Sequence, residues 1–143
     1  MPLRFDLGPF EQLFIGKCVL KNSHERAFFT VEGQLPILQG KDVLSPELAV
    51  SSLEKLYCCI QKMYLDETHE QHQSSYLALA ARSLTENPTQ ALELQAADQL
   101  IANRQYYKAL KALKKLIGPE AFLVDQTADA NYVPRRNAWK KAL

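Results

Sequence analysis

Residues 45–66 read SPELAVSSLEKLYCCIQKMYLD, and the hydrophobic period of the chain changes within this stretch. From Leu53 onward, apolar side chains recur three and four residues apart, which places them on one face of a helix. They are Leu53, Leu56, Tyr57, Ile60, Met63 and Tyr64. Ser45-Pro46-Glu47 is typical of a helix start, with a hydroxyl cap, a proline in the first turn and an acid near the positive end of the dipole. Ser51 or Ser52 could cap a later start instead. The stretch predicts a helix that runs to Asp66.

Upstream of Ser45, the chain consists of strand-length runs with turn residues between them. The runs cover residues 3–7, 12–15, 18–21, 26–32 and 35–38. In the first run, Leu3, Phe5 and Leu7 alternate with Arg4 and Asp6, which is the period of a half-buried strand. We expect four or five short antiparallel strands joined by tight turns, in an order that the sequence leaves open.

Downstream of Asp66, the helical period continues. A second helix is predicted from about residue 71 to residue 84, before Asn87-Pro88. Its inward-facing residues are expected to be Tyr76, Leu77, Ala80 and Leu84. A third helix begins near Thr89, and its apolar residues include Leu92, Ala96 and Leu100. Asn103 could end this helix or bend it before a fourth helix over Arg104–Ile117, which Gly118-Pro119 stops.

These patterns predict an α+β fold, with a small N-terminal antiparallel β-sheet followed by a C-terminal bundle of three to four helices. We expect residues 1–143 to form a single domain. It would comprise a β-rich part at 1–44, a helical part at 45–123 and a flexible basic tail at 124–143.

The composition is that of an ordinary globular protein, with 47% apolar and 23% charged residues. No apolar run approaches the roughly 20 residues of a membrane helix, and the N-terminus does not resemble a signal peptide. We therefore expect a cytoplasmic protein with no membrane partner. The three cysteines, Cys18, Cys58 and Cys59, suit neither a zinc site nor a disulfide framework and are expected to be reduced thiols.

Charge is distributed unevenly along the chain. Residues 101–143 hold nine Lys or Arg against three acids, a net charge of +6, whereas residues 1–100 carry −5. Such polarity suggests an anionic partner for one end of the chain, a nucleic acid or an acidic protein.

The fourth predicted helix concentrates the positive charge on one side. A cationic stripe of Arg104, Lys108, Lys111 and Lys115 stands opposite an apolar stripe of Tyr106, Leu110, Leu113 and Ile117. Lys and Arg on such a face are most often only its solvated side. The absence of any acid in the segment favours a binding role, and Tyr107 beside the stripe could stack on an unpaired base. Phe28 is another possible stacking platform, but we expect it to pack under a helix. The candidate RNA-binding residues are Arg104, Tyr107, Lys108, Lys111 and Lys115.

Motifs for catalysis or cofactor binding are missing from the sequence. It contains no phosphate loop, nucleophile elbow or dinucleotide fingerprint. His69 and His72 are three residues apart, which is not the spacing of a metalloprotease helix, and no third ligand is tied to them. Cys58 and Cys59 have no nearby base and are interpreted as structural thiols. We expect no enzyme activity, no cofactor and no metal.

Three segments, in order, resemble the FlbT family of flagellin-biosynthesis regulators. They are LPILQGKDVL at 35–44, LY at 56–57 with MYLD at 63–66, and YYKALKALKKLI at 106–117. The resemblance implies a regulator that acts after transcription, associates with the 5′ untranslated leader of flagellin mRNA and controls its translation or stability. It also implies flagellin or a companion flagellar regulator as possible partners. It leaves open whether the regulation represses or activates.

Two functions remain open at this point. Direct binding of the leader RNA would use the cationic helix and would weaken with salt. Alternatively, the chain could be a flagellin-binding chaperone or adaptor that takes a partner helix into an apolar groove and affects the mRNA only indirectly. The oligomeric state is not set by the sequence.

Overall fold

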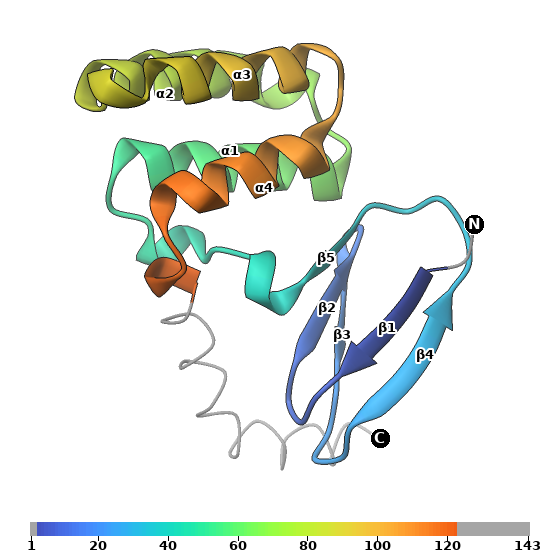
Figure 1. Cartoon of the computed structure of the whole chain (residues 1–143). Coiled ribbons are helices and arrows are strands. Elements are labelled where there is room, and N and C mark those ends of the chain that lie inside the picture. The colour runs from blue at the N-terminus through green and yellow to red at the C-terminus, as the bar shows by residue number, and fades with distance from the viewer. Residues whose placement is uncertain (1–2, 123–143) are drawn as a thin grey trace.

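A computed structural model describes residues 3–122 of the chain. Five short strands come first and four α-helices follow, which confirms the predicted α+β fold (Figure 1). The predicted tail at 124–143 lies outside the described residues. None of the described helices is long and apolar enough to cross a membrane.

Each strand overlaps one of the predicted strand-length runs, although β5 begins two residues later than its run. They are β1 (Leu3–Leu7), β2 (Gln12–Ile15), β3 (Cys18–Lys21), β4 (Ala27–Val31) and β5 (Ile37–Gln39). They form two sheets rather than the single sheet expected: β1 pairs with β4, and the second sheet has the order β3-β2-β5. All of these pairs are antiparallel.

A small apolar cluster, to which both sheets contribute side chains, explains why apolar and polar residues alternate in β1. Leu7 of β1, Leu13 of β2 and Ile37 of β5 are buried together, and the ring of Phe5 packs against it. Phe28 is different, because β4 presents alternate residues to opposite faces. Its side chain is 74% exposed, so the expectation that a helix covers it is wrong.

The helical part contains α1 (Ser52–Asp66), α2 (Gln73–Glu86), α3 (Ala91–Ala102) and α4 (Tyr106–Ile117). Short 3₁₀ turns precede or connect them: η1 (Gly40–Asp42), η2 (Pro46–Leu48), η3 (Glu70–His72) and η4 (Pro88–Gln90). The start signal at Ser45-Pro46 opens only the isolated turn η2. Ser51 is the cap of α1: its hydroxyl accepts from the Glu54 N–H at 3.1 Å, and the Glu54 carboxylate accepts from the Ser51 N–H.

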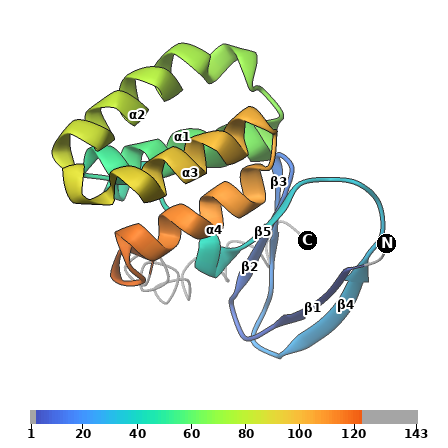
Figure 2. The ribbon, with the colours of Figure 1, turned by 45° about the horizontal axis from the view of Figure 1, so that its top comes forward.

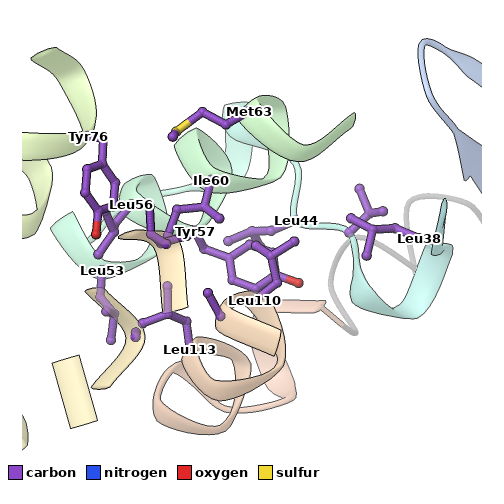
Figure 3. Close-up of a cluster of buried hydrophobic side chains, with 14 of the residues drawn as sticks. Leu38, Leu44, Leu53, Leu56, Tyr57, Ile60, Met63, Tyr76, Leu110 and Leu113 are labelled. Atoms are coloured by element: carbon purple, nitrogen blue, oxygen red, sulfur yellow. The ribbon is translucent and has the colours of Figure 1, made fainter. Parts of the chain in front are cut away.

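The main core lies between α1 and α4 and extends to the end of the sheets (Figure 3). Tyr57 and Ile60 of α1 meet Leu110 and Leu113 of α4, and all four side chains are at most 1% exposed. Leu44, in the segment between η1 and η2, reaches the same cluster. Burial of each such side chain contributes about 1.5–3 kcal/mol to stability.

The helices α2 and α3 make few contacts with each other, because α2 packs on α1 and α3 packs on α4 (Figure 2). Leu77 of α2, predicted to face inward, is 55% exposed. On α3 the buried residues are Leu94, Ala97 and Ile101, whereas Leu92 is 79% exposed. An apolar groove therefore remains open between these two helices.

Candidate nucleic-acid interface

Arg104 does not belong to the cationic helix. Its backbone lies in the left-handed region at φ 60°, and its N–H donates to the carbonyl of Ile101 at 2.9 Å. Asn103 and Arg104 thus turn the chain between α3 and α4, and α4 begins at Tyr106. The prediction that Arg104 extends the stripe of α4 is wrong, although its side chain remains exposed beside the start of that helix.

Lys111 is held by an acid from a distant part of the chain. Asp42 of η1 is 3% exposed, and its two carboxylate oxygens each lie 2.9 Å from a lysine Nζ, one from Lys111 and the other from Lys114. Lys114 also donates to the carbonyl of Lys41 at 2.6 Å. Arg104–Ile117 contains five Lys or Arg residues, and two of them, Lys111 and Lys114, therefore fasten α4 to η1.

The pKa values of Asp42 and Lys111 depend on two opposing effects, burial and ion pairing. Burial alone would raise the pKa of Asp42, but the hydrogen bonds and charges of Lys114 and Lys111 outweigh it and lower that pKa. For Lys111, burial alone would lower the pKa, and the hydrogen bond and charge of Asp42 raise it overall. Asp42 and Lys111 are thus both charged across the neutral range.

The remaining predicted cations of the helix are Lys108 and Lys115, and both are exposed. Neither takes part in an ion pair within residues 3–122. They lie seven residues apart, which is about two helical turns, so they share one face of α4. This face can meet a polyanion without breaking a contact of the described fold.

Tyr107 lies beside this face, as the sequence predicted, and its side chain is 43% exposed. The ring centroid is 6.4 Å from that of Tyr64 on α1, and Lys111 Nζ lies 5.4 Å from it. Tyr106, expected in the core, is partly buried against it, and its hydroxyl forms a hydrogen bond with Nδ1 of His69.

Two open hollows adjoin these tyrosines. One, of about 400 Å³, is lined by Arg104, Tyr106 and His69, among others. The other, of about 320 Å³, lies between the β1 edge, β5 and the start of α4, and includes Arg4 and Tyr107. Sequence reasoning missed these hollows because their walls come from segments up to about a hundred residues apart.

Two further features of the described residues concern metal binding and the reactivity of cysteine. No group of three or more His, Cys, Asp or Glu residues is placed to hold a metal ion within 3–122. Cys58 and Cys59 are partly buried thiols, and burial raises the pKa of Cys59, which disfavours the reactive thiolate.

The family model described as "Flagellar protein FlbT" matches residues 3–124, which is most of the chain. The chain belongs to the FlbT family. This FlbT assignment confirms the resemblance seen in the sequence. No solved structure matches the chain.

Curated FlbT relatives cover most of the chain. A "Probable flagellum biosynthesis repressor protein FlbT" of Rhodopseudomonas palustris strain TIE-1 is 36% identical over 88% of this chain and 100% of its own length. A Bradyrhizobium diazoefficiens relative, "Probable flagellum biosynthesis repressor protein FlbT 1", is 32% identical over 88% of this chain and 87% of its own. The Caulobacter vibrioides "Flagellum biosynthesis repressor protein FlbT", strain ATCC 19089, is 28% identical over 82% of this chain and 85% of its own.

Proposed function

We propose that this FlbT-family chain regulates flagellin synthesis after transcription, in the cytoplasm, by associating with the 5′ untranslated leader of flagellin mRNA. It would control translation or stability of that mRNA during flagellum assembly. The names of the relatives support a regulator of flagellum biosynthesis and favour repression as its sign.

The observation that best supports contact with RNA is the exposed cationic surface at the start of α4 and along this helix. Lys108 and Lys115 have no ion-pair partner in the described part of the chain, and Arg104 is exposed in the turn before α4. The half-exposed ring of Tyr107 adjoins this face. Cations provide affinity for phosphates, and an accessible aromatic ring provides a stacking surface for an unpaired base. This combination fits RNA better than it fits a merely solvated helix.

A direct test is titration of the purified full chain against labelled flagellin leader RNA at several salt concentrations. An unrelated RNA of equal length is the control. We expect tighter binding to the leader, with an affinity that falls as salt rises, by a logarithmic slope of about −0.7 for each phosphate neutralised. Equal or negligible binding of both RNAs would contradict direct recognition of the leader.

The groove between α2 and α3 favours a second candidate, the flagellin-binding chaperone or adaptor. It has a volume of about 220 Å³, and Leu77, Ala80 and Leu84 of α2 form one wall. Leu94 and Ala97 of α3 line the other side. Such a surface suits the apolar face of an amphipathic helix. On this alternative, flagellin binding survives moderate salt, and the purified protein does not bind RNA without its partner.

A further inference from the structure

The two hollows beside α4 adjoin each other. Leu35, in the connection before β5, and Tyr64 of α1 line both of them. The helices lie at the end of the sheets where β5 is found (Figure 1). The connection before β5 can therefore reach α1 and α4. The hydroxyl of Tyr64 fixes this connection, because it accepts from the Ile37 N–H at 3.1 Å. The junction between the hollows is therefore held by a defined contact.

The linings of the two hollows combine aromatic, cationic and amide groups. Tyr106 and Arg104 border the first hollow, and Tyr107 and Arg4 border the second. Gln34 in the first and Gln39 in the second provide side-chain amides, which can donate to and accept from the edges of bases. Glu67 is the acid among the residues that line the first hollow.

The size of each hollow also suits a small flat ligand. Volumes of about 400 and 320 Å³ lie at the lower end of the roughly 300–1,000 Å³ found for small-molecule sites. The groove between α2 and α3 differs, since aliphatic side chains form most of its walls. The mixed lining beside α4 favours bases of a polyanion over the apolar face of a protein helix.

We propose that the two hollows that meet at Leu35 and Tyr64 hold neighbouring unpaired nucleobases of a single-stranded RNA. This inference rests on the proposed RNA-binding function and gives it a site. One base stacks on the exposed ring of Tyr107, and the next lies beyond Leu35 near Arg104. Lys108 contacts the backbone along α4. Because the bases must leave any duplex, the site selects single-stranded segments of the leader.

Two variants with matched controls test the site. Leu35→Glu places an acid at the exposed junction, and Leu92→Glu makes the same change at an exposed position of α3 outside both hollows. Tyr107→Ala removes the stacking ring, and Leu20→Ala truncates an equally exposed apolar side chain on β3, outside both hollows. Thermal unfolding of each full-length variant confirms that it is folded before binding is measured.

Each protein is titrated with two probes, labelled flagellin leader RNA and a labelled uridine octanucleotide. The octanucleotide is also presented as a duplex with its complement. We expect Leu35→Glu and Tyr107→Ala to weaken single-strand binding about tenfold or more, since one stacked base accounts for a factor of this order. Leu92→Glu and Leu20→Ala should change it less than about threefold, and the duplex should bind weakly.

The two probes separate the failure of the site from the failure of the proposed function. If the leader is preferred but all four variants bind it alike, the hollows are not the site and the regulatory proposal stands. If the octanucleotide binds through the hollows and the leader binds no better, the site is confirmed and leader recognition is wrong. Absence of binding to either probe contradicts both. Loss of binding to a flagellin-terminus peptide, with RNA binding unchanged, would reassign the hollows to a protein.

Discussion

Lys111 Nζ lies 2.9 Å from Oδ2 of Asp42, an ion pair between residues that are 69 positions apart in the sequence. The partners differ in environment, because the Asp42 side chain is almost completely buried and the Lys111 side chain is partly solvated. Lys114 completes the cluster from the next turn of α4. The arrangement fixes α4 against η1, so it determines where the exposed face of α4 points.

Removal of the two lysines should destabilise the protein more than removal of the acid. Lys111→Ala with Lys114→Ala leaves a buried carboxylate without a cation, which costs about 3–5 kcal/mol. Asp42→Asn leaves two lysines that can reach water, so only charged hydrogen bonds are lost, at about 1.5–3 kcal/mol. Denaturant unfolding of both variants measures the difference. A cost for Asp42→Asn equal to or above that of the double variant would contradict this asymmetry.

The same cluster predicts a loss of stability in acid. The pKa of Asp42 is lower in the folded state than its ordinary value of 3.8. Its stabilising contribution is therefore complete above that value and disappears as the pH falls through the lower folded pKa. We expect the free energy of unfolding of the wild type to approach that of Asp42→Asn as the pH falls below 3.8. A constant difference between the two proteins over this range would exclude the cluster as the cause.

The start of α1 offers a test of the capping assignment. Ser51→Ala removes the hydroxyl that accepts from the Glu54 N–H, and we expect a cost of about 1 kcal/mol. Ser45→Ala is the matched control, because the Ser45 side chain makes no capping hydrogen bond to η2. In thermal unfolding, the midpoint temperature of Ser51→Ala should be clearly lower than that of Ser45→Ala. The reverse order would favour the start signal at Ser45-Pro46.

Local patterns predicted the elements well because their causes are local. Period two and the turn residues placed β1, β2 and β3 at their observed bounds. The end of α4 at Gly118 was also predicted, and this glycine has φ 96°, a conformation that other residues rarely adopt. The start of α1 was ambiguous because Ser45 offered one capping signal and Ser51 or Ser52 offered a later one. Only Ser51 with Glu54 closes a capping box.

The candidate site was only partly predictable, because tertiary contacts decide which cations remain available. No local signal marks Asp42 as the partner of Lys111, and helical spacing alone groups Lys111 with Lys108 and Lys115. Similarly, Arg104 fits the helical stripe by number but lies in the left-handed turn before α4. The hollows at Leu35 and Tyr64 depend on how the sheets meet the helices, which periodicity does not show.

The exposed lysines give a quantitative test of RNA contact. Lys108→Gln with Lys115→Gln removes two cations that make no ion pair within residues 3–122. The logarithmic salt slope of leader binding should become shallower by about 1.4, while thermal stability stays close to the wild type. Lys111→Gln is an unsuitable substitute because it breaks the pair with Asp42. An unchanged slope in the double variant would remove this face from the RNA interface.

The groove between α2 and α3 should reveal whether the chain also binds a protein helix. Leu77→Ser changes an exposed wall of the groove, and Leu92→Ser makes the same change at an exposed position of α3 outside it. If an amphipathic flagellin terminus occupies the groove, loss of one leucine contact weakens peptide binding by about tenfold or more. Leader RNA binding should be unaffected, because the groove lies apart from the hollows beside α4. Equal peptide affinity of the two variants would show that the groove does not take this helix, even if the wild type binds the peptide elsewhere.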